Sequence, residues 1–164
     1  MSIIIRKNPM IEKLKNKSDM DILEFVKRIP DKYEDFYITI NKNRVFLKDL
    51  DIIKKLLKRQ TFYGLYNPFL TGIMLIYREK GFRPYLKILA EDYKSASNLI
   101  KFLIWNHSHE DLFIKIKKDN PINKIMRKYG FIFHGGRGSE ILLTRKGTKQ
   151  KPIKRSKNYG KGNP

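Results

Sequence analysis

Hydrophobic residues recur along this chain at two spacings, one typical of strands and the other typical of helices. In the middle of the chain, short apolar runs rich in aromatic and branched residues are separated by turn residues, which predicts an antiparallel meander. Its three strands are expected at 61–66, 71–77 and 85–90.

The region before the meander carries the pattern of two helices. Ser18 is a good N-cap for the first helix, and Pro30 ends the apolar stripe that follows it. Residues 48–60 carry a wide apolar stripe at helical spacing and predict the second helix. Further strands are expected at 2–6, 36–40 and 45–47, the last two as a hairpin.

The region after the meander predicts a crossover to a parallel strand. Apolar residues from 96 to 104 fall on one helical face, and residues 112–116 then alternate as a strand. A right-handed crossover makes that strand parallel to 85–90. Asn120 and Gly130 are good start and stop residues for a short helix between them. A closing hairpin is expected from 131–133 and 141–144 around the turn 134–139.

The composition changes near residue 145. Residues 145–164 carry eight basic side chains, no acid and almost no apolar residue, so they cannot form a core. The expected organisation is one domain at 1–144 and a flexible basic arm at 145–164. The residues of the arm predicted to bind nucleic acid or another polyanionic partner are Arg145, Lys146, Lys149, Lys151, Lys154, Arg155, Lys157 and Lys161.

The whole chain is strongly basic, with 36 Lys and Arg against 16 Asp and Glu and a formal net charge of +20. Such a charge favours nucleic acid, a ribonucleoprotein or another acidic assembly as partner. The 26 Lys against 10 Arg, together with abundant Ile and Asn, are also what an AT-rich genome encodes. Part of the basic surplus is therefore explained by coding bias, which is compatible with a phage or viral protein.

The absence of cysteine excludes disulfides and thiolate metal sites, and three histidines are too few to predict a metal cluster. The apolar runs are much shorter than the ~20 residues that span a bilayer. The first residues lack the pattern of a signal peptide. These features predict a soluble protein that is located in the cytoplasm, or in the virion if the protein is viral, and that has no membrane partner.

The order of predicted elements, with Asn120 before a short helix and Gly130-Phe131 after it, resembles the GNAT family of acetyl-CoA-dependent N-acetyltransferases. The similarity is best over 61–144. It implies an α/β (α+β) fold with a mixed, mostly antiparallel sheet flanked by helices. It also implies that the strands at 85–90 and 112–116 splay apart at their C-terminal ends, where the family binds acetyl-CoA.

The resemblance implies a set of cofactor-binding residues around the loop that holds the CoA pyrophosphate in the family. That loop has the pattern Gln/Arg-x-x-Gly-x-Gly/Ala, whereas the matching stretch here, 91–98, contains no glycine and starts with Glu91 and Asp92. These two carboxylates oppose a bound polyanion. The implied cofactor-binding residues are Leu89, Ala90, Lys94, Ser95, Ala96, Ser97, Asn98 and Asn120.

The family often places a tyrosine in the short helix as the acid for the departing thiolate, and this position is Met126 here. A thioether cannot donate a proton. Tyr129 is the candidate substitute, although its spacing also fits a core position. Glu91 is the candidate base for an amine, with Glu110 as a further possibility.

Two functions follow from these observations. In the first, the chain is a diverged GNAT-fold protein, non-catalytic or weakly catalytic, that acts as a basic binding or assembly component on nucleic acid, a ribonucleoprotein or a viral particle. In the alternative, it is an active acetyl-CoA-dependent N-acetyltransferase that acts on an amine.

Overall fold

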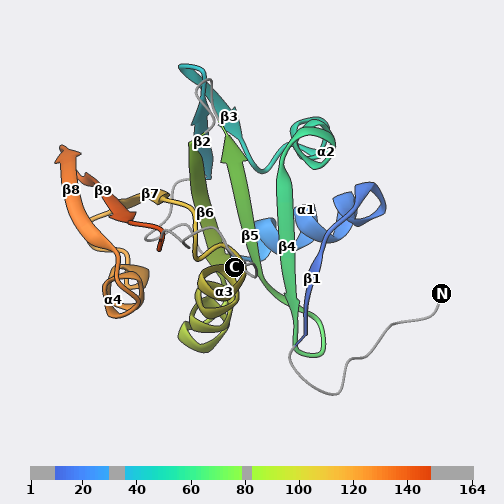
Figure 1. Cartoon of the computed structure of the whole chain (residues 1–164). Helices are drawn as coiled ribbons and strands as arrows, with labels where there is room; N and C mark the ends of the chain where they lie inside the picture. Colours follow the sequence, from blue (N-terminus) through green and yellow to red (C-terminus); the bar gives the residue numbers. More distant parts are fainter. Residues whose placement is uncertain (1–9, 30–35, 79–82, 149–164) are drawn as a thin grey trace, which may run out of the picture.

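The computed structural model describes residues 10–29, 36–78 and 83–148. The strand predicted at 2–6 lies outside these residues, and so does the arm from Lys149 onwards. The described part is built around a seven-stranded sheet with helices on both faces (Figure 1).

The sheet has the predicted meander at its centre. Every neighbouring pair of strands is antiparallel except β6 and β7, which are parallel. The predicted meander and crossover are therefore confirmed. In spatial order the strands are β1 (Met10–Lys13), β4 (Thr61–Tyr66), β5 (Leu70–Arg78), β6 (Pro84–Ala90), β7 (Leu112–Lys117), β9 (Glu140–Arg145) and β8 (Ile132–Arg137).

The helices divide between the two faces of the sheet, and each face has its own apolar cluster. One cluster joins the sheet to α3 (Tyr93–Asn106) and α4 (Ile122–Lys128). The other joins it to α1 (Asp19–Arg28), α2 (Leu50–Arg59) and the hairpin of β2 (Tyr37–Ile40) and β3 (Asn43–Phe46). A short 3-10 helix, η1 (Asn16–Ser18), precedes α1.

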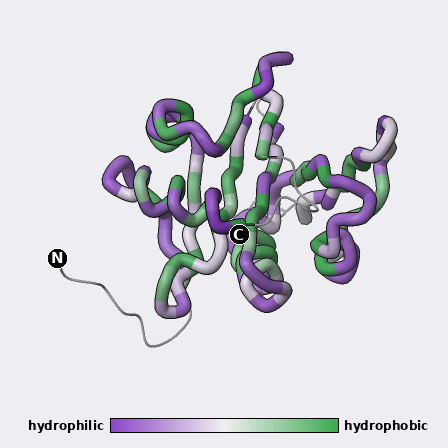
Figure 2. Tube along the Cα trace, turned by 180° about the vertical axis from the view of Figure 1, so that it is seen from behind, coloured by the Kyte–Doolittle hydropathy of each residue, from purple (hydrophilic) through white to green (hydrophobic). Residues whose placement is uncertain are grey.

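The hydropathy of the trace follows this layering, with apolar residues along the strands and polar residues at the loops (Figure 2). Side chains that alternate along a strand reach opposite faces, so both sides of the central strands are covered. None of the helices that the structure describes is long and apolar enough to cross a membrane.

Two local predictions were wrong in detail. The Ser18 side chain makes no capping hydrogen bond, and Asp19 Oδ1 instead accepts one from Met20 N at 2.7 Å. The predicted turn at 134–139 is too long, because β8 continues to Arg137 across a bulge. Gly136 is needed inside this strand, since a Cβ there would lie 2.8 Å from the Glu140 carbonyl oxygen. Glycine was interpreted as a turn residue, whereas here it permits a close strand contact.

Truncation of a buried residue of α3 should destabilise the fold strongly. Leu103 is fully buried, so Leu103→Ala should lower the free energy of unfolding by about 3 kcal/mol through lost contacts and a new cavity. Trp105, on the same helix, is 86% exposed. Trp105→Ala should therefore change the free energy of unfolding by less than about 0.5 kcal/mol. Denaturant unfolding of both variants is the measurement, and equal losses would contradict the described orientation of α3.

Candidate functional site

The parallel pair β6 and β7 separates soon after it forms. Only Tyr85 with Phe113 and Leu86 with Ile114 are in register, although both strands continue beyond them. The two strands then point in different directions (Figure 1). The predicted splay at their C-terminal ends is therefore present.

The backbone of β6 faces this splay at alternate residues. Glu91 N donates to Thr71 O of the neighbouring β5 end at 2.9 Å, so odd-numbered residues here direct their N–H and C=O groups toward β5. Ile88 and Ala90 consequently direct theirs toward the splay, where the register with β7 has ended. This edge can hydrogen-bond an extended ligand in the manner of an added strand.

The N-terminus of α3 follows directly after β6 and carries its own carboxylate. Asp92 is the N-cap, and its Oδ1 accepts a hydrogen bond from Ser95 N at 2.7 Å. Ser95 is buried and donates from Oγ to Thr71 Oγ1 at 3.1 Å. The carboxylate therefore satisfies a helix-end amide that a bound anion would otherwise use.

An ion pair joins Glu91, just before the start of α3, to the end of α1. Its Oε1 lies 3.0 Å from Arg28 Nη2 at the end of α1, and the same Arg28 nitrogen donates to the Leu70 carbonyl oxygen. The predicted base Glu91 thus has a guanidinium partner. Both side chains remain partly exposed, which limits the strength of the pair.

A polar face of α3 meets the end of α4. Lys94, Ser97 and Lys101 are spaced three and four residues apart and share this face. A hydrogen bond with the Ser97 side chain lowers the pKa of Tyr129, burial opposes the shift, and the charges of Lys101 and Lys128 support it. Lys128 Nζ also lies 5.8 Å from the centre of the Tyr129 ring. The site thus combines a phenol of lowered pKa with several cations.

Met126 and two of the predicted cofactor-binding residues, Asn120 and Leu89, have contacts within the fold. Met126 is fully buried in the cluster beneath α3 and α4, as expected for a residue without a polar role. Asn120 is buried and lies one residue before Pro121, the N-cap of α4, and its Oδ1 accepts a hydrogen bond from Ile122 N at 3.0 Å. Leu89 is buried in the cluster on the α1 and α2 face. The remaining cofactor candidates are Ala90 and Asn98, which are half-buried, and Ala96, which is buried in the cluster beneath α3 and α4.

Glu110 belongs to an ion-pair network at the start of β7. Burial raises its pKa, but hydrogen bonds and charges from Arg78 and His107 outweigh burial and lower it. The Glu110 oxygens lie 2.7 Å from Arg78 Nη2 and 2.8 Å from His107 Nδ1. This carboxylate ties the loop after α3 to β5.

Arg145, assigned to the basic arm from the sequence, is instead a residue of β9. Its Nε donates to the Tyr129 carbonyl oxygen at 3.0 Å. The next residues remain attached to the body, since Gly147 N donates to Asp111 Oδ1 at 2.8 Å and Thr148 N to Ser108 O at 2.8 Å. The predicted polyanion-binding role of Lys149 and the later basic residues stays a prediction, because they lie outside the described part of the chain.

A cavity of about 230 Å³ lies between the β2–β3 hairpin and the central sheet. The charged side chains that line it are Arg44, Lys87, Lys115, Lys117 and Glu140. Sequence reasoning missed this site. The alternation of Lys115 and Lys117 with buried isoleucines was the available signal, but the hairpin residues that close the cavity lie about seventy positions earlier in the chain.

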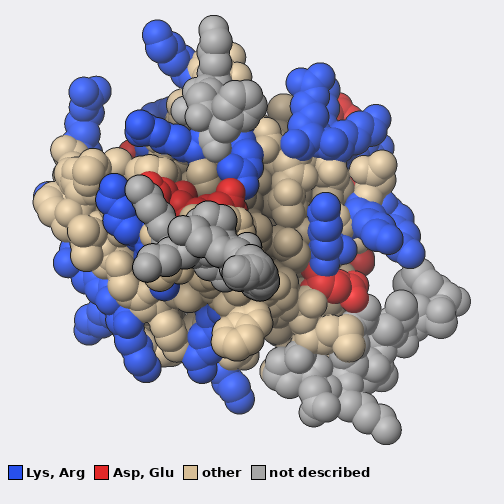
Figure 3. Space-filling model, in the orientation of Figure 1, with Lys and Arg blue, Asp and Glu red and all other residues tan. Residues whose placement is uncertain are grey.

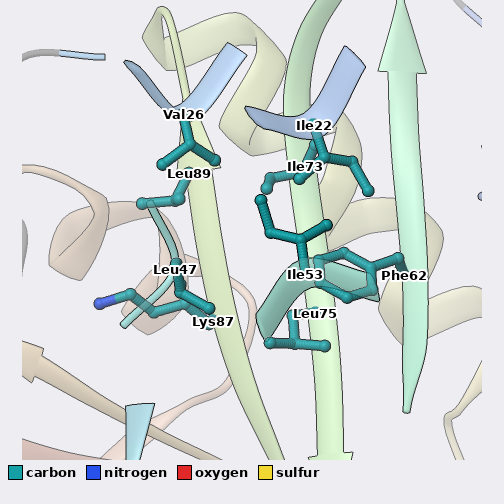
Figure 4. A pocket seen from close by; sticks show the side chains of 9 residues that line it. All are labelled: Ile22, Val26, Leu47, Ile53, Phe62, Ile73, Leu75, Lys87 and Leu89. Atoms are coloured by element: carbon teal, nitrogen blue, oxygen red, sulfur yellow. The ribbon is translucent and has the colours of Figure 1, made fainter. Parts of the chain in front are cut away.

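Lys87 lies at the boundary between this cavity and a small apolar pocket. Its stem packs among the residues of that pocket, whereas its nitrogen points away from Phe62 and Leu75 (Figure 4). The side chain is therefore anchored by its methylene groups and presents its charge elsewhere.

No protein-family model matches the sequence, and no curated protein matches it either. Solved structures do match. An N-acetyltransferase from Staphylococcus aureus Mu50 is 18% identical with a TM-score of 0.68, over 85% of this chain and 97% of that one. A GNAT-family acetyltransferase from Streptococcus pneumoniae is 15% identical with a TM-score of 0.66, over 86% and 100%.

A third match is the PaiA N-acetyltransferase from Thermoplasma acidophilum, solved in complex with coenzyme A. It is 12% identical with a TM-score of 0.62, over 85% of this chain and 99% of that one. At these identities the likeness concerns the fold, and the chain has the fold of the GNAT acetyltransferases.

Proposed function

We propose that this protein transfers an acetyl group from acetyl-CoA to an amine. The observation that carries the proposal is the splay of β6 and β7 beside the start of α3, in a fold shared with N-acetyltransferases. Two groups can meet at such a splay from opposite faces of the sheet. The cavity on the hairpin side supplies a place for the amine.

The residues present fit a CoA thioester, although without a glycine-rich loop. The backbone groups of Ile88 and Ala90 face the splay and suit an extended amide-containing arm. The phosphates would be held by the side chains of Lys94, Lys101 and Lys128, because Asp92 already occupies an amide of the helix end. Lys and Arg are spread over the visible face of the protein, so a polyanion meets a favourable potential (Figure 3).

When bound, the cofactor supplies the thioester carbonyl that an amine attacks. In this proposal the Glu140 carboxylate, which lines the cavity, accepts the proton that the amine nitrogen loses. Tyr129 gives its hydroxyl proton to the departing sulfur, since Met126 at the equivalent family position has none to give. One C–N bond forms, one C–S bond breaks, and the two proton transfers balance.

The proposal is tested by adding acetyl-CoA to the full chain. Its binding should raise the melting temperature by mass action and give a calorimetric heat, and thiol release should follow when an amine is added. Ser97→Asp should abolish the rise, because it places a negative charge on the phosphate-facing side of α3. Ser139→Asp, in the exposed turn before β9, is the matched control and should preserve it.

The opposite result is equally clear. The proposal would be refuted if millimolar acetyl-CoA produced no melting shift and no binding heat. That result would favour the non-catalytic binding role predicted from the basic composition.

A further inference from the structure

The cavity between the hairpin and the sheet opens where β6 and β7 diverge. Lys87 follows Leu86, the last residue of β6 in register, and Lys115 follows Ile114 on β7. Both lysines line the cavity. The alternating residues Leu112, Ile114 and Ile116 belong to the cluster beneath α3 and α4, so the lysines of β7 face the opposite side.

The walls of the cavity hold these cations in defined positions. Lys115 Nζ lies 5.0 Å from the centre of the Tyr85 ring, and Arg44 Cζ lies 5.2 Å from that of Tyr37. Tyr85 in turn stacks on Tyr77 with ring centres 5.8 Å apart. Aromatic rings thus contact two of the cationic groups and limit their freedom.

Lys87 is the most constrained of these cations. It is only 7% exposed, and its stem is packed into the apolar pocket beneath α1 and α2 (Figure 4). A charge in such a place is weakly screened, so it contributes to the electrostatic potential inside the cavity.

Among the described residues, four basic side chains and one acid therefore line the same cavity. We propose that this cavity binds a small molecule through an anionic group, a carboxylate or a phosphate, contacted by Lys87 and Lys115. A cationic ligand is disfavoured there by like-charge repulsion. Glu140 lies on β9 opposite Lys117 of β7 and lines the same cavity, where its carboxylate can contact a single amino group of the ligand.

The identification of this ligand as the acetyl acceptor rests on the proposed function. The acceptor is then an amine that also carries an anionic group, in the manner of an amino acid with an acidic or phosphorylated side chain. The anionic group is fixed by the lysines of the diverging strands, which leaves the amine free to face the splay.

The test is calorimetric titration of the full chain, without acetyl-CoA, with L-glutamate and O-phospho-L-serine as anionic probes. L-glutamine and L-lysine are the comparison probes of similar size, because they share the α-carboxylate of the anionic probes but lack the side-chain anion, which is the group assigned to the lysines. At least one of the two anionic probes should bind. Tighter binding of L-glutamate would identify a carboxylate as the preferred group, and tighter binding of O-phospho-L-serine would identify a phosphate. Lys87→Met and Lys115→Met should each raise its Kd at least tenfold, because both keep the stem and remove the charge. Lys124→Met, an exposed lysine of α4, should leave it within twofold.

Two results would overturn the inference. One is that neither anionic probe binds, or that L-lysine binds as well as they do. The other is that Lys87→Met and Lys115→Met bind the anionic probes as the unchanged chain does.

Thiol release with acetyl-CoA separates this inference from the proposed function. If the anionic probes bind but acetyl-CoA neither binds nor is consumed, the cavity assignment stands and the transferase proposal fails. If L-lysine is acetylated while the anionic probes neither bind nor react, the transferase proposal stands and the acceptor class is wrong.

Discussion

Replacing Lys94, Lys101 and Lys128 together with glutamine should weaken acetyl-CoA binding about a hundredfold. Each lysine lies on the polar face where α3 meets the end of α4. A charge pair at about 4 Å in water is worth roughly 1 kcal/mol, a factor of about five in affinity, and three such pairs multiply. Calorimetric titration at low ionic strength is the measurement, since salt screens these contacts.

The matched control is the triple replacement of Lys27, Lys55 and Lys58 with glutamine. These lysines are exposed on α1 and α2, which cover the other face of the sheet, so the net charge falls equally while the proposed phosphate contacts remain. Similar weakening in both triple variants would mean that only the overall charge attracts the cofactor.

A substitution of Asp92 gives a second control, for which the expected change in acetyl-CoA affinity is opposite. Asp92→Asn keeps an N-cap that can accept from Ser95 N but removes a negative charge near the phosphates, so it should tighten binding by about fivefold. Unchanged or weaker binding would place the phosphates away from the start of α3.

The fold was largely predictable because its signals are local. Apolar alternation and turn residues located β4, β5 and β6 to within a residue or two, and Asn120 and Gly130 located α4. Gly130 has a φ of +93°, the left-handed conformation expected of a helix stop. The parallel pairing of β6 and β7 followed from the handedness of crossovers.

The site was less predictable because its contacts join distant parts of the chain. Arg28, the partner of Glu91, lies 63 positions away in the sequence, and no local sequence pattern predicts this ion pair. The cavity forms only where the β2–β3 hairpin packs against β6 and β7. From the sequence alone, its lysines have the pattern of ordinary solvent-exposed strand residues. Tyr129 was an ambiguous position from its spacing, and only the packing of α3 against α4 brings Ser97 to it.

Tyr129→Phe should lower kcat for acetyl transfer about a hundredfold and leave acetyl-CoA binding within twofold. The variant removes the hydroxyl proton that the proposed function assigns to the departing sulfur and keeps the ring, and general acids contribute about 10²–10⁴-fold. Steady-state thiol release is the measurement, with acetyl-CoA affinity measured in parallel. An unchanged kcat would show that another group or water protonates the sulfur.

The pH profile distinguishes this role from a merely structural one. A proton donor works below its pKa, so kcat should fall as pH rises through the pKa of Tyr129, which Ser97, Lys101 and Lys128 lower from its usual value. Ser97→Ala removes the largest cause of the shift, which raises that pKa, and the alkaline fall should move to higher pH. In Tyr129→Phe the alkaline fall should disappear, whereas a structural role would scale the whole profile down without changing its shape. An alkaline limb that stays in place in both variants would assign it to a different group and remove Tyr129 from the proton path.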